Sequence, residues 1–414
     1  MPFSPLDPQR RVAFISMHGC PVARLGERET GGMNVFLLQT AKELGKRGLS
    51  VDVYTRYHDP SDPQVIELGP NSRVIHVRAG PYFEEKGSLY WYLPQFIRNV
   101  MCYSSAEQLE YQLVHSHYWL SGRAGMFLAK QWQVPHVASF HTLASLKQQA
   151  YVGAPEPEMR AGAERKIMEA AELVLAYSDH ERDAMARLYD VARPRIEVLP
   201  AGVDTDVFRP MDREACKREL GLEGKKVVLY VGRVEPIKGL DLLLNAVTSI
   251  EDRRDLKLVM VGGKEGEPEV VRLKARIQEM GLAEMVWFVG PVKQERLPTF
   301  YNAAEALVLP SHYESFGLVA LEALACGTPV VASRVGGLPT FLKDGETGYL
   351  VPWRSPDSFA DRLEVLLTHA ALRESMGRAG RQKALSLGWD RLAERLEGKY
   401  SSLLSPLLPA AAGS

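Results

Sequence analysis

Cysteine is scarce among the 414 residues, and no two cysteines form a CxxC pair; they are Cys20, Cys102, Cys216 and Cys326. This spacing fits a reducing compartment and argues against a zinc site. Also missing is any run of about 18 apolar residues, so we expect no membrane span. The start of the chain, MPFSPLDPQRR, has no apolar core and does not predict a signal peptide. These absences together predict a cytoplasmic protein.

The sequence also lacks an excess of either charge, because 50 Lys and Arg residues stand against 51 Asp and Glu residues. The formal net charge of −1 gives no electrostatic basis for binding nucleic acid or an acidic membrane. Apolar residues make up 46% and charged residues 24%, as in an ordinary soluble globular protein. We therefore expect no nucleic-acid partner.

What the sequence does contain is a regular alternation of short β-branched runs and helical stretches. One series runs from RVAFISMHG to RIEVLPAG, and a second runs from VVLYVGR to TPVVAS. This alternation predicts α/β architecture with parallel sheets covered on both faces, and the length predicts two domains. Among the expected helices are 35–47, 157–171 and a final helix over 389–404.

The polar segment 203–225 separates the two series and marks the expected domain boundary. We predict a Rossmann-like domain over 1–205, a second over 206–388 and a terminal helix within 389–414. Open α/β sheets bind ligands outside the carboxyl ends of their strands. The functional residues should therefore follow strands and face a cleft between the two domains.

Two glutamates, Glu314 and Glu322, lie eight positions apart in PSHYESFGLVALEALACGTPVVAS. The pattern predicts a strand, a turn containing Glu314, and a helix that begins near Gly317. The N-terminus of such a helix favours phosphate, and the carboxylates can accept hydrogen bonds from sugar hydroxyls. The alternative is that Glu314 complements the helix dipole and Glu322 is a solvated helix residue. Apolar residues surround Glu322, which weakens that alternative.

A second group of candidates follows the first strand of the later series. In VGRVEPIKGLD, Arg233 and Lys238 lie five residues apart across a turn that contains Pro236. Both can converge on one anion, with arginine making a forked contact and lysine supplying a point charge. Basic residues after strands are commonly only solvated, so this pair alone is a weak signal.

The third candidate is GGMN, Gly31 to Asn34, which lies between the first strand and the first helix. Its glycines permit close approach of backbone amides to a phosphate. A plain turn with Asn34 near the helix cap is an equally good interpretation of these residues alone. The sequence contains neither GxGxxG nor GxxxxGK[ST], so it lacks the fingerprints of nicotinamide and P-loop chemistry.

Two histidines, His117 and His141, each end a predicted strand, although a lone histidine is usually structural. No HExxH motif or carboxylate cluster supports a metal site. Asp204, Thr205 and Asp206 form a DxD sequence, which holds a metal in some sugar-transferring enzymes. Because it falls in the interdomain segment, we interpret it as turn chemistry and expect no metal.

Taken together, these motifs resemble the retaining glycosyltransferases of family 4, which have the GT-B fold of two Rossmann-like domains facing a cleft. The matching elements are GGMN, PAGVDTDVFRP, VGRVEPIKGLD, the E-x7-E segment of Glu314 and Glu322, and VGGLPTFLKDGETGYLV. They cover nearly the whole chain in order. The resemblance implies that a nucleotide-sugar donor, UDP-linked, binds between the domains and that no cofactor is required.

The resemblance also implies a role for each matching residue. Arg233 and Lys238 would hold the donor pyrophosphate with the Gly32 amide, and Glu322 would bind the ribose. Glu314 and the amides of Phe316, Gly317 and Leu318 would hold the donor sugar, with His141 near the reacting carbon. The catalytic set implied in this way is His141, Arg233, Lys238 and Glu314. The final helix would cross back to the first domain, as in other members of this fold.

Within the family, GGMNVF, HSHYWLSG and FHTL resemble the inositol-phosphate glycosyltransferases of mycothiol synthesis, which use UDP-N-acetylglucosamine. The residues that correspond to their acceptor site are Asn34, Lys86, Tyr118, Thr142 and Arg160. A lysine, an arginine and two hydroxyls would form a cradle for a phosphate dianion. Sucrose-phosphate synthases are relatives that have GGQ where this chain has GGM. A phosphorylated acceptor is thus implied more strongly than its identity.

The resemblance therefore implies a hexosyltransferase that moves glucose or N-acetylglucosamine from a UDP-sugar to a phosphorylated polyol or sugar. Inositol phosphate is the favoured acceptor, and transfer to fructose 6-phosphate is the alternative. A sugar-nucleotide epimerase, a phosphorylase or a non-catalytic nucleotide-sugar-binding protein are alternatives of other classes. A nicotinamide-dependent dehydrogenase is the weakest alternative, because its glycine fingerprint is missing. The oligomeric state is left open between a monomer and a homodimer.

Overall fold

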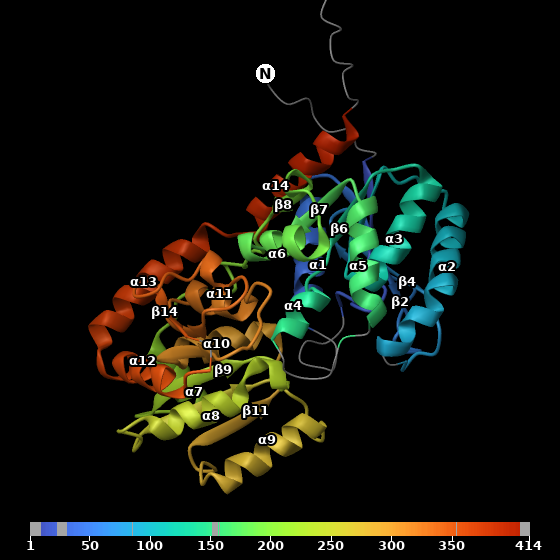
Figure 1. Ribbon diagram of the computed structural model, residues 1–414. Helices are drawn as coiled ribbons and strands as arrows, with labels where there is room; N and C mark the ends of the chain where they lie inside the picture. The colour runs from blue at the N-terminus through green and yellow to red at the C-terminus, as the bar shows by residue number, and fades with distance from the viewer. Residues whose placement is uncertain are drawn as a thin grey trace, which may run out of the picture.

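Two α/β halves make up the molecule, and each is built on its own sheet (Figure 1). The computed structural model describes residues 10–22, 31–84, 86–150, 156, 158–352 and 354–405, with only the backbone of Lys86. The first sheet uses strands from the first half of the sequence, and the second uses strands from the later half. The predicted α/β class with two parallel sheets is confirmed.

In the first sheet, eight described strands lie in the order β3-β4-β2-β1-β5-β6-β7-β8. All neighbours pair in parallel except β3 and β4, which form an antiparallel hairpin at the edge. Because β1 lies between β2 and β5, the direction of winding reverses beside β1. The strands are β1 (Arg11–Ile15), β2 (Ser50–Arg56), β3 (Val65–Gly69), β4 (Ser72–Val77), β5 (Leu113–His117), β6 (His136–Ser139), β7 (Leu173–Ala176) and β8 (Ile196–Val198).

The second sheet has six described strands in the order β11-β10-β9-β12-β13-β14, and every pair is parallel. Its winding reverses between β9 and β12, so the loops after these two strands open on the same crevice. The strands are β9 (Lys226–Val231), β10 (Leu256–Val261), β11 (Val286–Gly290), β12 (Ala306–Leu309), β13 (Val330–Ser333) and β14 (Gly348–Val351).

Helices cover both faces of each sheet, as the continuous apolar strands predict. In the first half they are α1 (Gly32–Lys46), α2 (Leu93–Ala106), α3 (Trp119–Trp132), α4 (Ala144–Gln149), α5 (Glu158–Ala170) and α6 (Asp179–Tyr189). In the second half they are α7 (Arg213–Leu220), α8 (Leu240–Ser249), α9 (Pro268–Glu279), α10 (Leu297–Ala303), α11 (Leu318–Ala325), α12 (Pro356–Thr368) and α13 (Ala370–Leu385), and α14 (Trp389–Leu404) ends the described chain. No helix among the described residues has the length and apolarity that a membrane crossing needs.

The helix predicted over 35–47 begins three residues earlier, at Gly32. The reason is visible at its start, where the Asn34 side chain accepts a hydrogen bond from the Gly31 N–H at 3.1 Å. Amides 34 and 35 then donate to the Gly31 carbonyl. The glycines that suggested a loop therefore form the first turn of the helix, and its amino end points out of the first half.

The last helix, α14, lies against the first half of the molecule although it ends the chain (Figure 1). Buried Tyr400 places its hydroxyl 2.6 Å from His115 Nδ1 on β5. Farther along, Glu397 pairs with Arg47 at 2.5 Å, just beyond α1. The domain boundaries at 205/206 and 388/389 stay predictions, while these contacts show that α14 joins the C-terminal segment to the first sheet.

The segment between the two sheets is a tightly bonded crossing. Asp204 Oδ1 accepts the N–H groups of Asp206 and Val207 at 3.0 and 3.1 Å, which agrees with the interpretation of DxD as turn chemistry. Val203 bridges to Gly388, so the outgoing and returning segments run side by side. A Cβ on Gly202 would lie 2.6 Å from the Trp389 nitrogen, and only glycine fits this crossing.

We predict that Gly202→Ala lowers the free energy of unfolding by about 1–3 kcal/mol, because the added methyl meets backbone that cannot rotate away. Urea unfolding followed by circular dichroism measures this change. Gly398→Ala in α14 is the matched control, because nothing lies within 4 Å of the place its methyl group would take and alanine favours a helix. Equal stabilities for the two variants would contradict the close crossing.

Candidate active site

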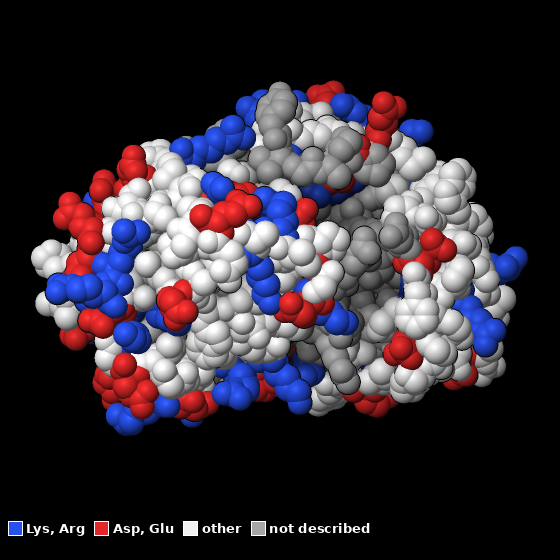
Figure 2. Space-filling model, turned by 90° about the horizontal axis from the view of Figure 1, so that it is seen from below, with Lys and Arg blue, Asp and Glu red and all other residues white. Residues whose placement is uncertain are grey.

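A cavity of about 540 Å³ lies between the carboxyl ends of the two sheets. Its lining comes from both halves and includes every residue predicted for the donor: Gly32, Arg233, Lys238, Glu314, Phe316, Gly317, Leu318 and Glu322. Three of the predicted acceptor residues, Asn34, Tyr118 and Thr142, and His141 line the same cavity. On the face of the molecule seen in Figure 2, basic and acidic side chains are interspersed.

Lys238 and Glu314 form an ion pair at 2.8 Å, and their side chains are 19% and 15% exposed. Lys238 ends the short 3-10 turn Pro236–Lys238 after β9, and Glu314 lies in the loop after β12. The two loops touch, since a Cβ on Gly239 would lie 2.1 Å from the Pro310 carbonyl oxygen. The ion pair is therefore fixed by packed backbone at the switch point of the second sheet.

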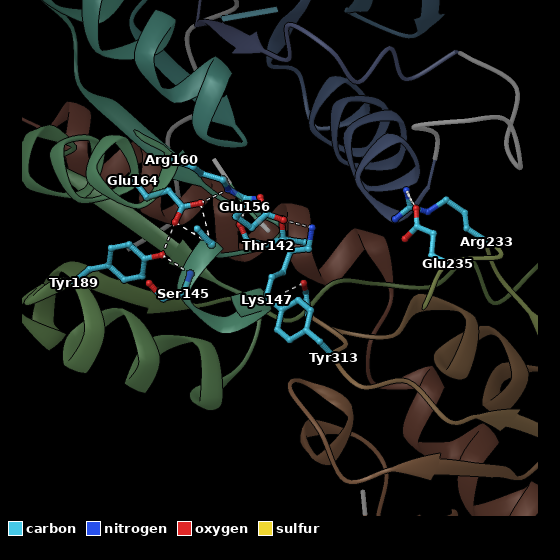
Figure 3. A network of polar contacts seen from close by, with 12 residues as sticks. Thr142, Ser145, Lys147, Glu156, Arg160, Glu164, Tyr189, Arg233, Glu235 and Tyr313 are labelled. Carbon is cyan, nitrogen blue, oxygen red and sulfur yellow. Dashed lines mark hydrogen bonds and ion pairs between the residues drawn. The ribbon is translucent and has the colours of Figure 1, made fainter. Parts of the chain in front are cut away.

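Arg233 follows β9 directly and pairs with Glu235 at 2.8 Å, with both side chains partly exposed. A Cβ on Gly31 would lie 4.0 Å from Arg233 Nε, so the guanidinium of the second half approaches the start of α1 in the first half. Figure 3 shows Arg233 and Glu235 beside the end of that helix. A Cβ on Gly32 would likewise lie 3.2 Å from Leu318 Cδ1. The amino ends of α1 and α11 thus meet across the cavity.

The first backbone amides of α11 donate no hydrogen bonds within the helix, as an anion site requires. Ala320 and Leu321 donate to the Gly317 carbonyl at 3.0 and 3.2 Å, which places the amides of Leu318 and Val319 ahead of the intrahelical bonds. Gly317 has φ +97°, a conformation that side chains disfavour, and a Cβ there would lie 2.5 Å from Leu338. The residue that caps this helix is therefore restricted to glycine by both space and conformation.

Glu322 is a buried carboxylic acid in α11 that reaches the cavity wall. Its Oε2 accepts a hydrogen bond from the Tyr301 hydroxyl at 2.7 Å. Burial raises the pKa of Glu322 to about 7, because ionisation in apolar surroundings is unfavourable. The alternative of a solvated helix residue is therefore wrong.

His141 lies at the centre of an aromatic and polar cluster beneath the cavity. Its Nε2 is 3.0 Å from His117 Nδ1, and the Tyr177 hydroxyl is 3.0 Å from its Nδ1. Burial lowers the pKa of His141 to about 3, so its imidazole is neutral at physiological pH. Its backbone has φ +60°, which costs about 1–3 kcal/mol for a residue with a side chain. The surrounding contacts hold the ring where an unstrained backbone would not place it.

A compact network of charges adjoins the cavity behind the lining residues Thr142 and Lys147 (Figure 3). Arg160 is 1% exposed and donates to Glu164 at 2.7 Å, to Glu156 at 2.5 Å, and to the carbonyl and hydroxyl oxygens of Thr142 at 2.6 and 2.9 Å. Glu156 also pairs with Lys147. Two cations and two carboxylates therefore balance one another where a phosphate dianion was predicted to bind.

The other predicted acceptor residues have structural contacts as well. Asn34 is buried, and its Nδ2 donates to the Cys20 carbonyl at 2.7 Å. The Tyr118 ring lies 4.7 Å below the Arg160 guanidinium carbon, a cation–π contact. Lys86 begins the 3-10 segment Lys86–Tyr92, but its side chain lies outside the described residues. Arg160 does not line the cavity itself, so its predicted contact with an acceptor requires a change at Glu156.

Comparison with known proteins agrees with this architecture. The family model for Glycosyltransferase Family 4 matches residues 30–207, and the model for glycosyl transferases group 1 matches residues 212–383. The chain is 40% identical to the D-inositol 3-phosphate glycosyltransferase of Corynebacterium jeikeium, over 95% of this chain and 97% of that protein. It is 38% identical to the protein of the same name from Corynebacterium glutamicum, over 95% and 97%.

The chain belongs to glycosyltransferase family 4. Among solved structures, the sucrose-phosphate synthase of Thermosynechococcus elongatus superposes with a TM-score of 0.89 at 34% identity, covering 95% of this chain and 99% of that one. The fold of this glycosyltransferase is thus GT-B, as predicted, and the chain is an enzyme. The roles of the individual cavity residues stay predictions.

Sequence reasoning about this glycosyltransferase missed several cavity residues, among them Lys147, Tyr177, Glu235 and Tyr313. Glu235 follows Arg233 by two positions, and this proximity was a usable signal for an ion pair. Lys147 lies in a short helix without a motif, and Tyr313 packs into the core of the first half although it belongs to the second. Contacts of that kind depend on how the halves meet, and no local pattern reports them.

The pKa of Glu322 gives a prediction about stability. A carboxyl with an ordinary pKa of 4.5 releases its proton in the unfolded chain, whereas the folded chain holds it up to about pH 7. Rising pH in this window therefore favours the unfolded state. Compared with Glu322→Gln, the wild type should lose up to about 3 kcal/mol of unfolding free energy across the window.

Urea unfolding of both proteins over a pH series measures that difference. Glu223→Gln, at an exposed loop position, is the control and should show no pH-dependent difference from the wild type. If the unfolding free energies of Glu322→Gln and of the wild type vary with pH in parallel, the Glu322 carboxyl ionises normally in the folded protein.

Proposed function

We propose that this glycosyltransferase moves a hexosyl group, glucose or N-acetylglucosamine, from a UDP-sugar to a phosphorylated polyol or sugar, with inositol phosphate favoured. The observation that carries the proposal is one cavity lined by all the residues predicted for the donor and by three of those predicted for the acceptor, Asn34, Tyr118 and Thr142. The names of the relatives, D-inositol 3-phosphate glycosyltransferase at 38–40% identity over nearly full length, support this acceptor.

The second half and the amino end of α1 together supply complementary groups for each part of a nucleotide diphosphate sugar. Arg233 and Lys238 offer two cations for the pyrophosphate, and the amino ends of α1 and α11 add unpaired amides and positive dipole ends. Glu322 lies deeper in the same wall and accepts hydrogen bonds from ribose hydroxyls in this proposal. Glu314, held by Lys238, faces hydroxyls of the transferred sugar.

In this proposal the donor pyrophosphate replaces the carboxylates that pair with Lys238 and Arg233. Lys238 and Arg233 already have carboxylate partners at 2.8 Å, so the site is ordered before the ligand arrives. A diphosphate brings more negative charge than a single carboxylate and also contacts the helix amides. The cations therefore shift toward the ligand, and Glu314 is released to accept hydrogen bonds from sugar hydroxyls.

On the acceptor side, a phosphate dianion would compete with Glu156 for Lys147 and Arg160. Glu156 bridges these two cations in the described structure, and the Thr142 hydroxyl lies on the same guanidinium. A ligand phosphate makes several bonds with this geometry, whereas an acceptor without phosphate offers nothing to replace Glu156. The proposal thus accounts for selection of phosphorylated acceptors through exchange of anions.

The transfer step in this proposal depends on positioning and electrostatics. The two walls bring donor and acceptor together and exclude water that would hydrolyse the donor. Arg233, Lys238 and the α11 amides stabilise charge that develops on the departing diphosphate. Neutral His141 offers a hydrogen bond but no acidic proton. The acceptor proton passes to a phosphate oxygen of the donor, and the sugar keeps its anomeric configuration, as the family resemblance implies.

A second acceptor is favoured by one observation, the superposition on a sucrose-phosphate synthase at 34% identity. Transfer of glucose to fructose 6-phosphate uses the same donor groups and the same exchange at Glu156. The Met33 position, where sucrose-phosphate synthases have glutamine, lies in the cavity lining and distinguishes this chain from them. An epimerase would release nucleotide without any acceptor, so acceptor dependence separates that class.

The test of the substrate proposal is one matrix of UDP- and GDP-sugars against inositol phosphate, fructose 6-phosphate and glucose phosphates, read as nucleotide release. We expect release from a UDP-sugar that depends strictly on a phosphorylated acceptor and is greatest with inositol phosphate. Free inositol and free sugars are the controls and should be inactive. Release that proceeds equally without acceptor would contradict transfer.

We further predict that Lys238→Ala lowers kcat by about 100- to 1,000-fold, because it removes a cation from the departing diphosphate. The variant should remain folded, but its unfolding temperature should fall, because the change leaves Glu314 without its partner in a largely shielded position. Lys343→Ala, whose side chain is 63% exposed, is the control and should keep full activity. Near-normal turnover of Lys238→Ala would count against the donor site.

A further inference from the structure

A cysteine and two histidines from separate strands come together at the edge of the first sheet. Cys20 follows β1, His58 follows β2 and His76 lies near the end of β4, and these three strands are neighbours in the sheet. One ligand atom from each residue lies within 4.8 Å of the others. Cysteine spacing alone argued against zinc. Spacing within one segment gives no information about a cluster whose members come together only when the chain folds.

The ring of His76 is fixed with one nitrogen aimed at the cysteine. His76 is fully buried, its Nδ1 lies 2.7 Å from the Pro63 carbonyl, and its ring stacks on Tyr57 at 5.4 Å. A carbonyl only accepts, so Nδ1 carries the proton and the neutral ring has its lone pair on Nε2. That Nε2 lies 3.4 Å from Cys20 Sγ. A backbone carbonyl on one ring nitrogen and a lone pair aimed at a second ligand residue on the other is a common arrangement of a metal-binding histidine.

His58 has the other common supporting group. Its Nδ1 lies 3.0 Å from Asp62 Oδ2, an ion-pair distance that lacks hydrogen-bond geometry but places a carboxylate beside the imidazole, as is common for histidines that bind metals. Asp62 is itself held in place, because Oδ2 accepts from the amides of His58 and Asp59 at 3.3 and 3.0 Å. His58 is also the partly exposed member of the cluster, so an ion has a route to the site.

The separation between Cys20 and His76 suits a tetrahedral ion of the size of zinc. With Zn–S of about 2.3 Å and Zn–N of about 2.0–2.1 Å, sulfur and nitrogen ligands of one ion stand about 3.5 Å apart. The Cys20–His76 separation of 3.4 Å matches this edge. One thiolate and two imidazoles are ligands that select zinc over calcium or magnesium, which prefer oxygen.

We infer that Cys20, His58 and His76 bind one Zn²⁺ ion, with the fourth coordination position open to water. Binding replaces the thiol proton of Cys20, which leaves to solvent, with the metal, and no redox partner is involved. The ion would tie the ends of β1, β2 and β4 together at the edge of the cleft.

The position of this ion gives it a structural role beside the cavity. The Cys20 carbonyl accepts a hydrogen bond from Asn34 Nδ2 at 2.7 Å, and Asn34 Oδ1 accepts from the Gly31 amide. The metal would thus stabilise the segment that holds the amino end of α1. Binding of the metal does not depend on the proposed function. Only an effect of the metal on acceptor binding would depend on it.

The competing explanation is a hydrogen bond from the Cys20 thiol to His76 Nε2, with no metal. The two are separated by titrating the chelator-treated full chain with Co²⁺, because a thiolate ligand adds a strong charge-transfer absorption in the near ultraviolet. Zn²⁺ content by mass spectrometry of the purified chain and the shift of unfolding temperature with added Zn²⁺ are independent readouts. Added Mg²⁺ should change neither.

We expect one Zn²⁺ per chain and a cobalt–thiolate band that zinc abolishes. Cys20→Ser and His76→Gln should lose both, whereas Cys102→Ser, which removes the exposed cysteine, should keep them. Asp62→Asn should keep the band but weaken zinc binding by about 10- to 100-fold. A wild type without the band, or with zinc uptake equal to that of Cys20→Ser, would overturn the inference and leave the hydrogen bond.

Discussion

The constraint on which the rest of the molecule depends is that two parallel sheets present their carboxyl ends to one cleft. Strand ends are fixed by fully buried cores, so the loops that leave β9 and β12 have little freedom. Their backbones pack so closely that a Cβ on Gly239 would lie 2.1 Å from the Pro310 carbonyl oxygen. This contact fixes the positions of Lys238 and Glu314. The donor wall is therefore rigid in backbone, and the adjustable elements of the site are the charged side chains that line it.

Charge in the cleft is compensated before any ligand binds, but to different degrees. The Lys238–Glu314 pair is largely shielded from solvent, whereas Arg233 and Glu235 are 43% and 37% exposed. A shielded pair fixes geometry, and an exposed pair contributes little stability and exchanges partners readily. On the acceptor wall, fully buried Arg160 is surrounded by two carboxylates and a threonine. By this criterion the Arg160 network and the Lys238–Glu314 pair are the fixed parts of the site, and the Arg233–Glu235 pair is the part that exchanges partners most readily.

The positions of the residues predicted for the donor could be inferred from the sequence far better than the positions of those predicted for the acceptor. The donor residues lie in short motifs after strands, where the topology fixes direction, and all of them line the cavity. The acceptor residues were inferred by correspondence, and that gave no sign that Glu156 would occupy Arg160 or that Asn34 would hold the Cys20 carbonyl. The helix start at Gly32 was missed because glycine opposes helix formation unless a side chain such as Asn34 caps it. Contacts between halves, such as those of Tyr313, follow from assembly and leave no local pattern.

The buried histidines connect the last helix to this site in a physical way. Tyr400 of α14 contacts His115, the His115 and His117 rings lie 4.1 Å apart, and His117 is 3.0 Å from His141. Burial lowers the pKa of each of the three histidines, so the ladder is neutral and its hydrogen bonds carry orientation rather than charge. A neutral ring in a strained backbone conformation needs such support from several sides. The returning helix therefore supports the imidazole that faces the cavity, in addition to closing the fold. Both halves of the enzyme contribute to the position of this ring.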